Sequence, residues 1–173
     1  MRRLSMMVVL ALMTLPLTPR TAGAQDACAT FAWPVERERQ QFAAASKPEW
    51  PSGASIPQAP NEGFALRLEP AASAKLSRAP ERPARHGGAF AGMGSIAGLK
   101  PGLYQISLSQ DAWLDVVQDD AFARSAAHSS SRGCNGVRKS VRFHLGASPL
   151  VIQVSDVAEP VINVAITAVN ETK

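Results

Sequence analysis

The chain has 173 residues, a length that favours a single domain. It carries 18 Lys and Arg against 14 Asp and Glu, but three of the arginines, Arg2, Arg3 and Arg20, precede residue 25. Without that segment the balance is 15 to 14, which removes a global electrostatic argument for nucleic acid or an anionic membrane as partner. Any electrostatic partner must therefore be sought in local clusters of charge.

The start of the chain has the three parts of a secretory signal peptide. Arg2 and Arg3 form a charged start, Met6 to Leu17 form an apolar run, and Ala22-Gly23-Ala24 has the small-residue pattern of a cleavage site. The apolar run is too short to span a bilayer, which needs about 20 residues. We therefore expect residues 1–24 to be removed and the product to be periplasmic or secreted, without a membrane span.

Cys28 and Cys134 are the two cysteines of the chain. In an exported protein an even pair favours a disulfide, which here would tie the N-terminal region to the centre of the chain. Closing a loop of roughly 100 residues would stabilise the fold by about 4–5 kcal/mol in the chain-entropy model. The alternative is two free thiols that bind a metal, which would need a Cys/His cluster that the sequence does not show.

Residues 25–62 are expected to form a helix and a linker. Pro34 suits the first turn of a helix, so we predict a helix from Pro34 to about Ala45 that packs at one end of the domain. Residues 47–62 contain four prolines and little periodicity, which indicates a surface linker. Trp50 in this linker is a candidate for stacking on a sugar ring, although a tryptophan beside proline more often packs locally.

Residues 63–173 show the period-two alternation of half-buried strands, with turn residues between the segments. Enrichment in isoleucine, valine and threonine supports strands. Together these features predict a mainly β fold, an antiparallel β-sandwich of six to eight strands with a jelly-roll-like or accessory-domain-like character. The expected strands with alternation span 64–69, 104–108, 112–118, 137–145, 150–154 and 161–169. Two further expected strands are a short one at 72–76 and one in the small, glycine-rich stretch 89–97.

Two of these segments, 104–108 and 112–118, are separated by a tight break and are expected to pair as a hairpin. A polar, serine-rich loop, 119–136, then leads through the second cysteine to the strand 137–145. We expect the hairpin and this strand to be the centre of the domain.

The strand 137–145 carries the most suggestive charges. Arg138, Arg142 and His144 project from one face of the predicted strand, opposite its apolar residues. Lys139 interrupts the apolar face near the loop, where its stem can reach water. Such a row of cations could bind a carboxylate, a phosphate or an acidic glycan.

The alternative is that acidic neighbours neutralise this row. Asp115 on the expected hairpin and Asp119 or Asp120 in the loop could form cross-strand pairs with the arginines. In that case the row is a solvated face without a ligand.

Recognised catalytic motifs do not occur in the sequence. His86, His128 and His144 are the three histidines, and none belongs to an H-x-H, H-x-D or HExxH arrangement. There is also no G-x-S-x-G elbow, P-loop or dinucleotide fingerprint. We therefore predict no catalytic residues, no metal ligands and no cofactor, unless folding brings the histidines together.

Two segments resemble the motifs of a protein family. Phe31-Ala32-Trp33-Pro34-Val35-Glu36-Arg37-Glu38 follows the pattern F-x-W-P-x-x-R-E, and Cys134-Asn135-Gly136-Val137-Arg138-Lys139-Ser140-Val141-Arg142-Phe143 follows C-x-G-x-R-K-S-V-x-F. On these residues the chain resembles an uncharacterised family of small exported proteobacterial proteins, over most of its length beyond the leader. Some members carry the label homogentisate 1,2-dioxygenase, which implies a cupin-like enzyme with iron held by two histidines and one carboxylate. The strand pattern also resembles the β-sandwich domains appended to secreted peptidases, which act as accessory or binding modules.

The leading expectation is an exported, non-enzymatic β-sandwich that binds a glycan, an envelope polymer or a protein partner. Arg138, Arg142 and His144 are the candidate contact residues, with Trp50 second. One alternative is a metal-dependent dioxygenase of the homogentisate 1,2-dioxygenase type, with iron as cofactor. The other alternative is a structural envelope protein.

Overall fold

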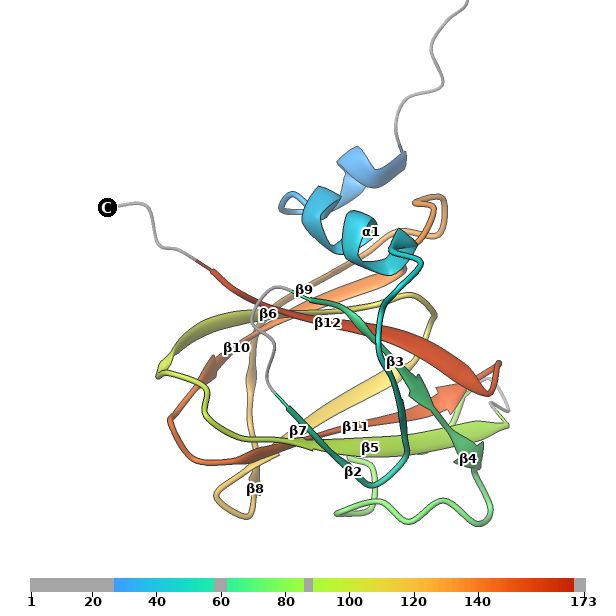
Figure 1. Cartoon of the computed structure of the whole chain (residues 1–173), viewed down its shortest axis with the longest axis vertical. Helices are drawn as coiled ribbons and strands as arrows, with labels where there is room; N and C mark the ends of the chain where they lie inside the picture. Colours follow the sequence, from blue (N-terminus) through green and yellow to red (C-terminus); the bar gives the residue numbers. More distant parts are fainter. Residues whose placement is uncertain (1–26, 58–61, 86–88, 170–173) are drawn as a thin grey trace, which may run out of the picture.

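The computed structural model describes residues 27–57, 62–85 and 89–169. The expected signal peptide, residues 1–24, lies outside the described residues, as does His86. The described residues form two mixed β-sheets that pack face to face, with one α-helix on the outside (Figure 1). The prediction of a mainly β sandwich with an N-terminal helix is therefore confirmed. Neither described helix has the length and apolar character that crossing a bilayer requires.

Sheet A is the upper layer in Figure 1. In spatial order its strands are β1 (Glu49–Pro51), β3 (Phe64–Arg67), β12 (Val161–Ala168), β6 (Gly102–Leu108), β10 (Lys139–Leu145) and β9 (Ser125–Ser130). β1 runs parallel to β3, and every other neighbouring pair is antiparallel. β9 and β1 are therefore the two edges of this sheet.

Sheet B lies below it. In spatial order its strands are β2 (Ala54–Ile56), β5 (Phe90–Ile96), β11 (Leu150–Val157), β7 (Trp113–Gln118) and β8 (Ala121–Phe122), and β4 (Glu69–Pro70) also pairs with β5. β2 runs parallel to β5, and the other pairs are antiparallel.

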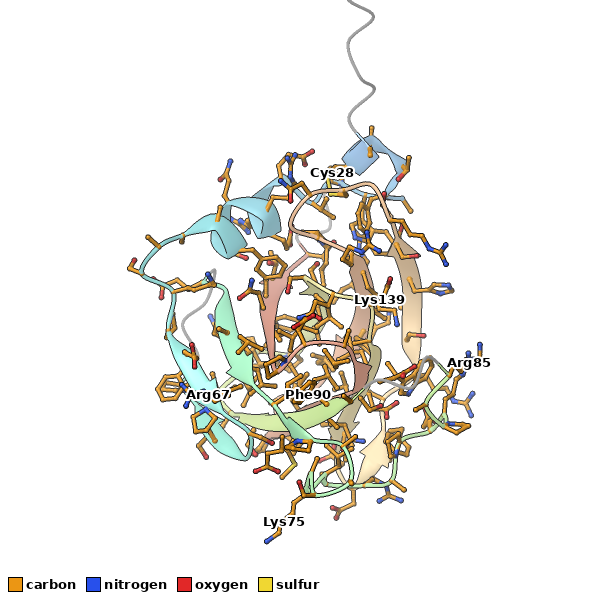
Figure 2. All side chains as sticks on the ribbon, turned by 90° about the vertical axis from the view of Figure 1, so that its right-hand side faces the viewer. Cys28, Arg67, Lys75, Arg85, Phe90 and Lys139 are labelled. Atoms are coloured by element: carbon orange, nitrogen blue, oxygen red, sulfur yellow. A yellow bond between two sulfur atoms is a disulfide. The ribbon has the colours of Figure 1, made fainter. Side chains whose placement is uncertain are left out.

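Alternation along the long strands produces the core between the sheets (Figure 2). In sheet A, Val141 of β10 pairs with Ile106 of β6, and both side chains are buried. In sheet B, Ile152 of β11 pairs with Val116 of β7, and these side chains are also buried. Burying one such side chain stabilises the folded state by about 1.5–3 kcal/mol.

The glycine-rich segment 89–97 forms β5, as predicted, and its glycines have a packing role. A Cβ atom on Gly92 would lie 2.8 Å from Leu68 Cδ2, and one on Gly94 would clash with Ile56 Cδ1. The missing side chains therefore let two apolar residues close over β5.

The N-terminal segment covers the outer face of sheet A. η1 (Ala27–Thr30) and α1 (Glu36–Ala43) lie above this sheet in Figure 1. Glu36 and Glu38 occupy the first turn of α1, where carboxylates favour the positive end of a helix. The helix was expected at one end of the domain, but it covers a sheet face instead. The reason is a second apolar cluster, made by Cys28, Phe31, Val35, Phe42, Cys134, Val137 and Ala165.

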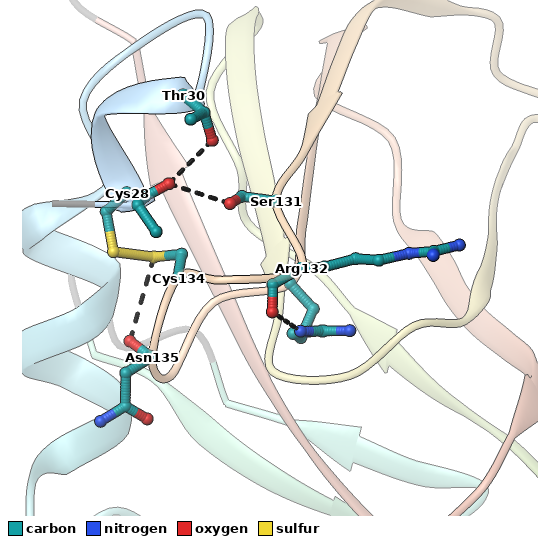
Figure 3. The surroundings of a disulfide bond; sticks show 8 residues. Cys28, Thr30, Ser131, Arg132, Cys134 and Asn135 are labelled. Carbon is teal, nitrogen blue, oxygen red and sulfur yellow. Dashed lines mark hydrogen bonds between the residues drawn. A yellow bond between two sulfur atoms is a disulfide. The ribbon is translucent and has the colours of Figure 1, made fainter. Parts of the chain in front are cut away.

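The predicted disulfide between Cys28 and Cys134 is confirmed (Figure 3). The two Cα atoms are 4.5 Å apart and the residues are 106 positions apart in the chain. Beside the disulfide, the backbone oxygen of Ala27 accepts hydrogen bonds from Ser131 Oγ at 2.9 Å and Thr30 Oγ1 at 2.7 Å. The bond therefore holds the N-terminal cover against the segment that connects β9 to β10.

The expected hairpin between segments 104–108 and 112–118 is wrong. These segments are β6 and β7, and they belong to different sheets. β6 pairs instead with β10 and β12, which come much later in the chain. The short break at 109–112 therefore carries the chain from one sheet to the other, a connection that is as short as a hairpin turn.

The expected linker at 47–62 is also wrong for the part that the structure describes. Residues 49–51 and 54–56 form β1 and β2, which add one strand to each sheet. Both pair in parallel, so the sandwich is not purely antiparallel. Strands of three residues are too short to show a periodicity, and proline is tolerated at a sheet edge.

The expected loop at 119–136 contains two further strands. Asp119 and Asp120 both have positive φ, 52° and 57°, and form the two-residue turn between β7 and β8. β9 then pairs with β10 as an edge strand. The segment 72–76 is not a strand, because the chain turns at 71–73. The described residues thus form twelve strands, several of them very short, instead of the predicted six to eight.

Candidate functional site

β10 places the candidate residues Arg142 and His144 on the same face of sheet A. Arg142 pairs with Gln105 and His144 with Leu103 on the outer face, whereas Val141 and Phe143 face the core. The alternation predicted for this strand therefore holds from Lys139 onward.

Arg142 is occupied by contacts within the protein. Its guanidinium lies 4.2 Å from the centre of the Trp33 ring and donates two hydrogen bonds of 3.3 Å to Gln105 Oε1. Gln105 Nε2 in turn donates to Glu38 Oε1 at 3.0 Å. Glu38 is only 2 % exposed, so this network connects α1 to sheet A. Arg142 therefore positions the helical cover.

Arg138 is also occupied. Its Nη2 lies 3.1 Å from Asp111 Oδ2, and its Nη1 donates to the backbone oxygen of Arg132. Neutralisation of the row was expected from Asp115, Asp119 or Asp120, but the partner is Asp111, which follows β6. The difference arises because Asp115 belongs to sheet B.

The other two candidates lie apart from these arginines. His144 is exposed on the outer face of β10. Trp50 lies in β1, where it is half-buried and packs against the main core. The structure therefore does not join Trp50 to the basic row in one surface.

A cleft of about 650 Å³ opens on the opposite side of β10, between the edge formed by β9 and β10 and the strands β7 and β8. Its chemistry comes from cations around an aromatic ring. We call the group Arg82, Trp113, Arg124, His128 and Lys139 the cation cleft. The lining also includes Glu81, Leu114, Asp115, Phe122, Ala123, Ser125, Val141 and Phe143.

Trp113 is the centre of the cation cleft. Arg82 Cζ lies 4.5 Å and Lys139 Nζ 5.4 Å from the centre of its ring, distances at which a cation is attracted to the ring. Trp113 Nε1 donates to Asp115 Oδ1 at 2.6 Å, which holds the ring in place. Arg82 and Lys139 thus lie against a fixed aromatic surface.

The carboxylate of Asp115 is already occupied. Besides Trp113 Nε1, it accepts hydrogen bonds of 3.3 Å from Gln153 Nε2 and from the backbone N–H of Glu81. It is 3 % exposed and forms no ion pair within 4.0 Å among the described residues. Asp115 therefore supports the cleft wall and does not neutralise the cations directly.

Arg82, Arg124 and Lys139 form no ion pair with an acidic residue in the described ranges. Within the part of the chain that the structure describes, no carboxylate oxygen lies within 4.0 Å of Arg82, Arg124 or Lys139. Lys139 Nζ donates a hydrogen bond to the backbone oxygen of Ala112. The cleft therefore carries three cations that form no ion pair among the described residues, although the carboxylates of Glu81 and Asp115 also line it.

Lys139 is half-buried in the wall of the cleft. Burial lowers the pKa of its ammonium below the ordinary value of 10.5, because desolvation disfavours the charged form. The charge of Arg82 lowers this pKa further, while those of Asp111 and Asp115 oppose the shift. The nearby acids therefore do not fully offset the effect of desolvation on the pKa of Lys139.

The two described histidines lie on opposite faces of sheet A. His128 of β9 pairs with Val141, on the core side, whereas His144 lies on the outer face. They therefore cannot share one mononuclear metal site of the kind that the dioxygenase alternative requires. No group of three His, Cys, Asp or Glu side chains suited to a metal occurs in the described ranges.

Reasoning from sequence alone missed most of the cation cleft. Arg82 comes from a loop and Arg124 from a predicted loop, and neither has a sequence motif. The one available signal was Lys139, whose charge interrupts an apolar strand face.

The chain matches no family model, no curated protein and no solved structure.

Proposed function

We propose that this protein is an exported, non-enzymatic β-sandwich module that binds an anionic group in the cation cleft. The ligand group is a carboxylate or a phosphate carried by an envelope polymer, a glycan or a partner protein. The disulfide is compatible with an oxidising compartment and supports a periplasmic or secreted location.

The observation that supports the proposal is that three cations line one cleft and form no ion pair with any described acidic residue. Arginine and lysine residues exposed singly on a surface are common and need no ligand. In the cation cleft, however, one of the cations is partly desolvated, which disfavours the folded state. Such a locally unfavourable arrangement is typical of functional sites, where a ligand offsets it.

The site chemistry favours binding over catalysis. Arginine guanidinium groups hold carboxylate and phosphate groups through paired hydrogen bonds, and lysine adds a point charge. The ring of Trp113 and the side chain of Phe122 provide apolar surface beside these cations. The cleft can therefore hold the charge of a ligand and pack against the carbon atoms around it.

The test is a comparison of two carboxylate-bearing probes, oligogalacturonate and oligoglutamate, by titration calorimetry at low salt. We expect at least one to bind, and the variant Arg82→Gln/Arg124→Gln/Lys139→Met to lose at least about tenfold in affinity, since charged hydrogen bonds contribute most of the binding. Arg37→Gln/Lys75→Met/Lys100→Met removes the same charge from exposed positions and should bind as the unmodified protein does. Absence of binding by both probes, or equal losses in the two variants, would refute the proposal.

A further inference from the structure

The cation cleft opens beside a free sheet edge. β9 pairs with β10 on one side, and no described strand pairs with its other side. Its sequence, Ser125–Ser130, contains no proline and no lysine, the residues that commonly protect an exposed edge. The one irregularity is a register shift opposite Arg142 and Phe143, which leaves the segment 127–130 regular. This segment can therefore accept another strand.

The hydrogen bonding of β9 shows which of its backbone groups are available. The N–H of Ser131 donates to the oxygen of Arg138 at 3.1 Å, so the backbone of Ser131 faces β10. Backbone direction alternates along an antiparallel strand, so that the backbone groups of Ser129 also face β10. The N–H and C=O groups of His128 and Ser130 therefore point away from the sheet.

The side chains of β9 determine what an added strand would present to the cleft. His128 pairs with Val141 and lines the cleft, whereas Ser129 pairs with Ser140 on the outer face. The outer face is partly covered, because the N–H of Ala32 donates to Ser129 Oγ at 3.0 Å. Cross-strand neighbours share a face, so the residue opposite His128 would point toward the cation cleft.

We propose that the partner is an extended acidic segment of another protein, which adds to β9 as an edge strand and places alternate carboxylates in the cation cleft. This inference rests on the proposed function and names its ligand class. The backbone of the segment would bond to His128 and Ser130, and its acidic side chains would meet Arg124 and Lys139. Main-chain bonds supply affinity in this mode of recognition, and the side chains on alternate positions supply specificity.

Charge decides between this occupant and a second copy of the chain. Two β9 strands paired with each other would bring two cation clefts together, and like charges across an interface disfavour association. An acidic segment is complementary to the same surface. The observations therefore favour a partner with alternating acids over self-association.

The experiment uses the whole protein and short peptides of alternating glutamate and threonine, measured by titration calorimetry. N-methylation of the glutamates removes the amides that would bond to β9, because in an antiparallel pair the residues whose side chains share the face of His128 are also those that bond to it. We expect this change to reduce affinity at least about tenfold. N-methylation of the threonines alters amides that point away from β9 and should retain binding.

A variant of the protein tests the same edge. Ser130→Pro removes a backbone donor that points away from the sheet, a position where proline is tolerated. Ser130→Pro should reduce the affinity for the alternating peptide about tenfold. Ser130→Thr should leave this affinity unchanged. Both variants should keep the melting temperature of the unmodified protein. Oligogalacturonate cannot form a strand, so its affinity should be the same for both variants.

The outcomes separate the two proposals. Equal binding of both N-methylated peptides, or preference for oligogalacturonate, would refute strand addition and leave the cation cleft as an anion site. Failure of every carboxylate probe would refute both. Concentration-dependent dimers in sedimentation, without peptide binding, would assign the edge to a second copy and also overturn this inference.

Discussion

The cations on the two faces of β10 differ in whether the protein supplies them with partners. On the outer face, Arg142 bonds to Gln105 and contacts Trp33. Arg138, which precedes the strand, pairs with Asp111. On the core side, Lys139 lines an open cleft with Arg82 and Arg124, which have no acidic partner among the described residues. Strand alternation therefore determines on which face of the sheet a charged side chain lies. What covers that face decides whether the charge is structural or available.

The cover itself explains the difference. The N-terminal segment brings Trp33 and Glu38 over the outer face. The ring of Trp33 contacts Arg142 directly, and Glu38 accepts a hydrogen bond from Gln105, which in turn accepts from Arg142. In the cleft near β9, no described segment brings a carboxylate within ion-pair distance of the cations. The cations there line a cleft with Trp113, Glu81 and Asp115 but form no ion pair among the described residues, so a ligand can still improve their environment.

The largest expected effect concerns the outer face. Cys28→Ala/Cys134→Ala should lower the free energy of unfolding by about 2–5 kcal/mol, since the disulfide closes a loop of 106 positions and holds the cover in place. Guanidinium chloride unfolding measures this loss. If the cover and the cleft are independent, carboxylate binding below the transition should be retained. Loss of binding in a variant that remains folded would show that they are coupled.

The next effect contrasts two arginines directly. Arg142→Met should lower the free energy of unfolding by about 1–3 kcal/mol, because it leaves the buried oxygen of Gln105 without its donors. Arg82→Met should change it by no more than about 0.5 kcal/mol, as is usual for exposed residues. Binding should show the reverse order, with affinity reduced by the second change alone. Similar stability losses for both would contradict the division between structural and available cations.

Removing the charge of Lys139 is expected to stabilise the fold. Lys139→Met keeps the apolar stem in a half-buried position and removes the desolvated ammonium. We expect the melting temperature to stay equal or rise, and carboxylate affinity to fall by about tenfold. A clear drop in melting temperature would mean that Lys139 is a structural residue.

The difference in stability between Lys139→Met and the unmodified protein should depend on pH, because the pKa of Lys139 is lowered in the folded state. A lysine whose pKa in the folded state lies below 10.5 disfavours folding while it is charged, and this penalty disappears as pH rises through the folded pKa toward 10.5. The stability advantage of Lys139→Met should therefore be full near about pH 7 and shrink by about pH 10. Denaturant unfolding of both proteins over this range measures it, and a gap that widens with pH would contradict the assignment.

The smallest expected effect concerns metal. Because His128 and His144 lie on opposite faces of sheet A, we expect His128→Ala and His144→Ala to leave the iron content of the purified protein unchanged. Metal analysis by mass spectrometry checks this. Stoichiometric iron that either variant loses would support the dioxygenase alternative.

Several features of this protein were determined locally and could be read from sequence. The alternation in the strands 137–145 and 150–154, the helix near Pro34 and the pairing of two cysteines all appear in the structure. Each depends on a period or a count within one segment. Features that depend on neighbouring residues can therefore be predicted from a short stretch of sequence.

Only the tertiary structure decided which strands are neighbours and which cations remain available. β6 and β7 are adjacent in the chain but lie in different sheets, because the partners of β6 come from distant segments. The short strands β1, β2 and β8 are held by such neighbours and have no period of their own. In the same way, a lysine on a strand, an arginine in a loop and a tryptophan in the other sheet form one cleft, because sheet packing brings distant residues together.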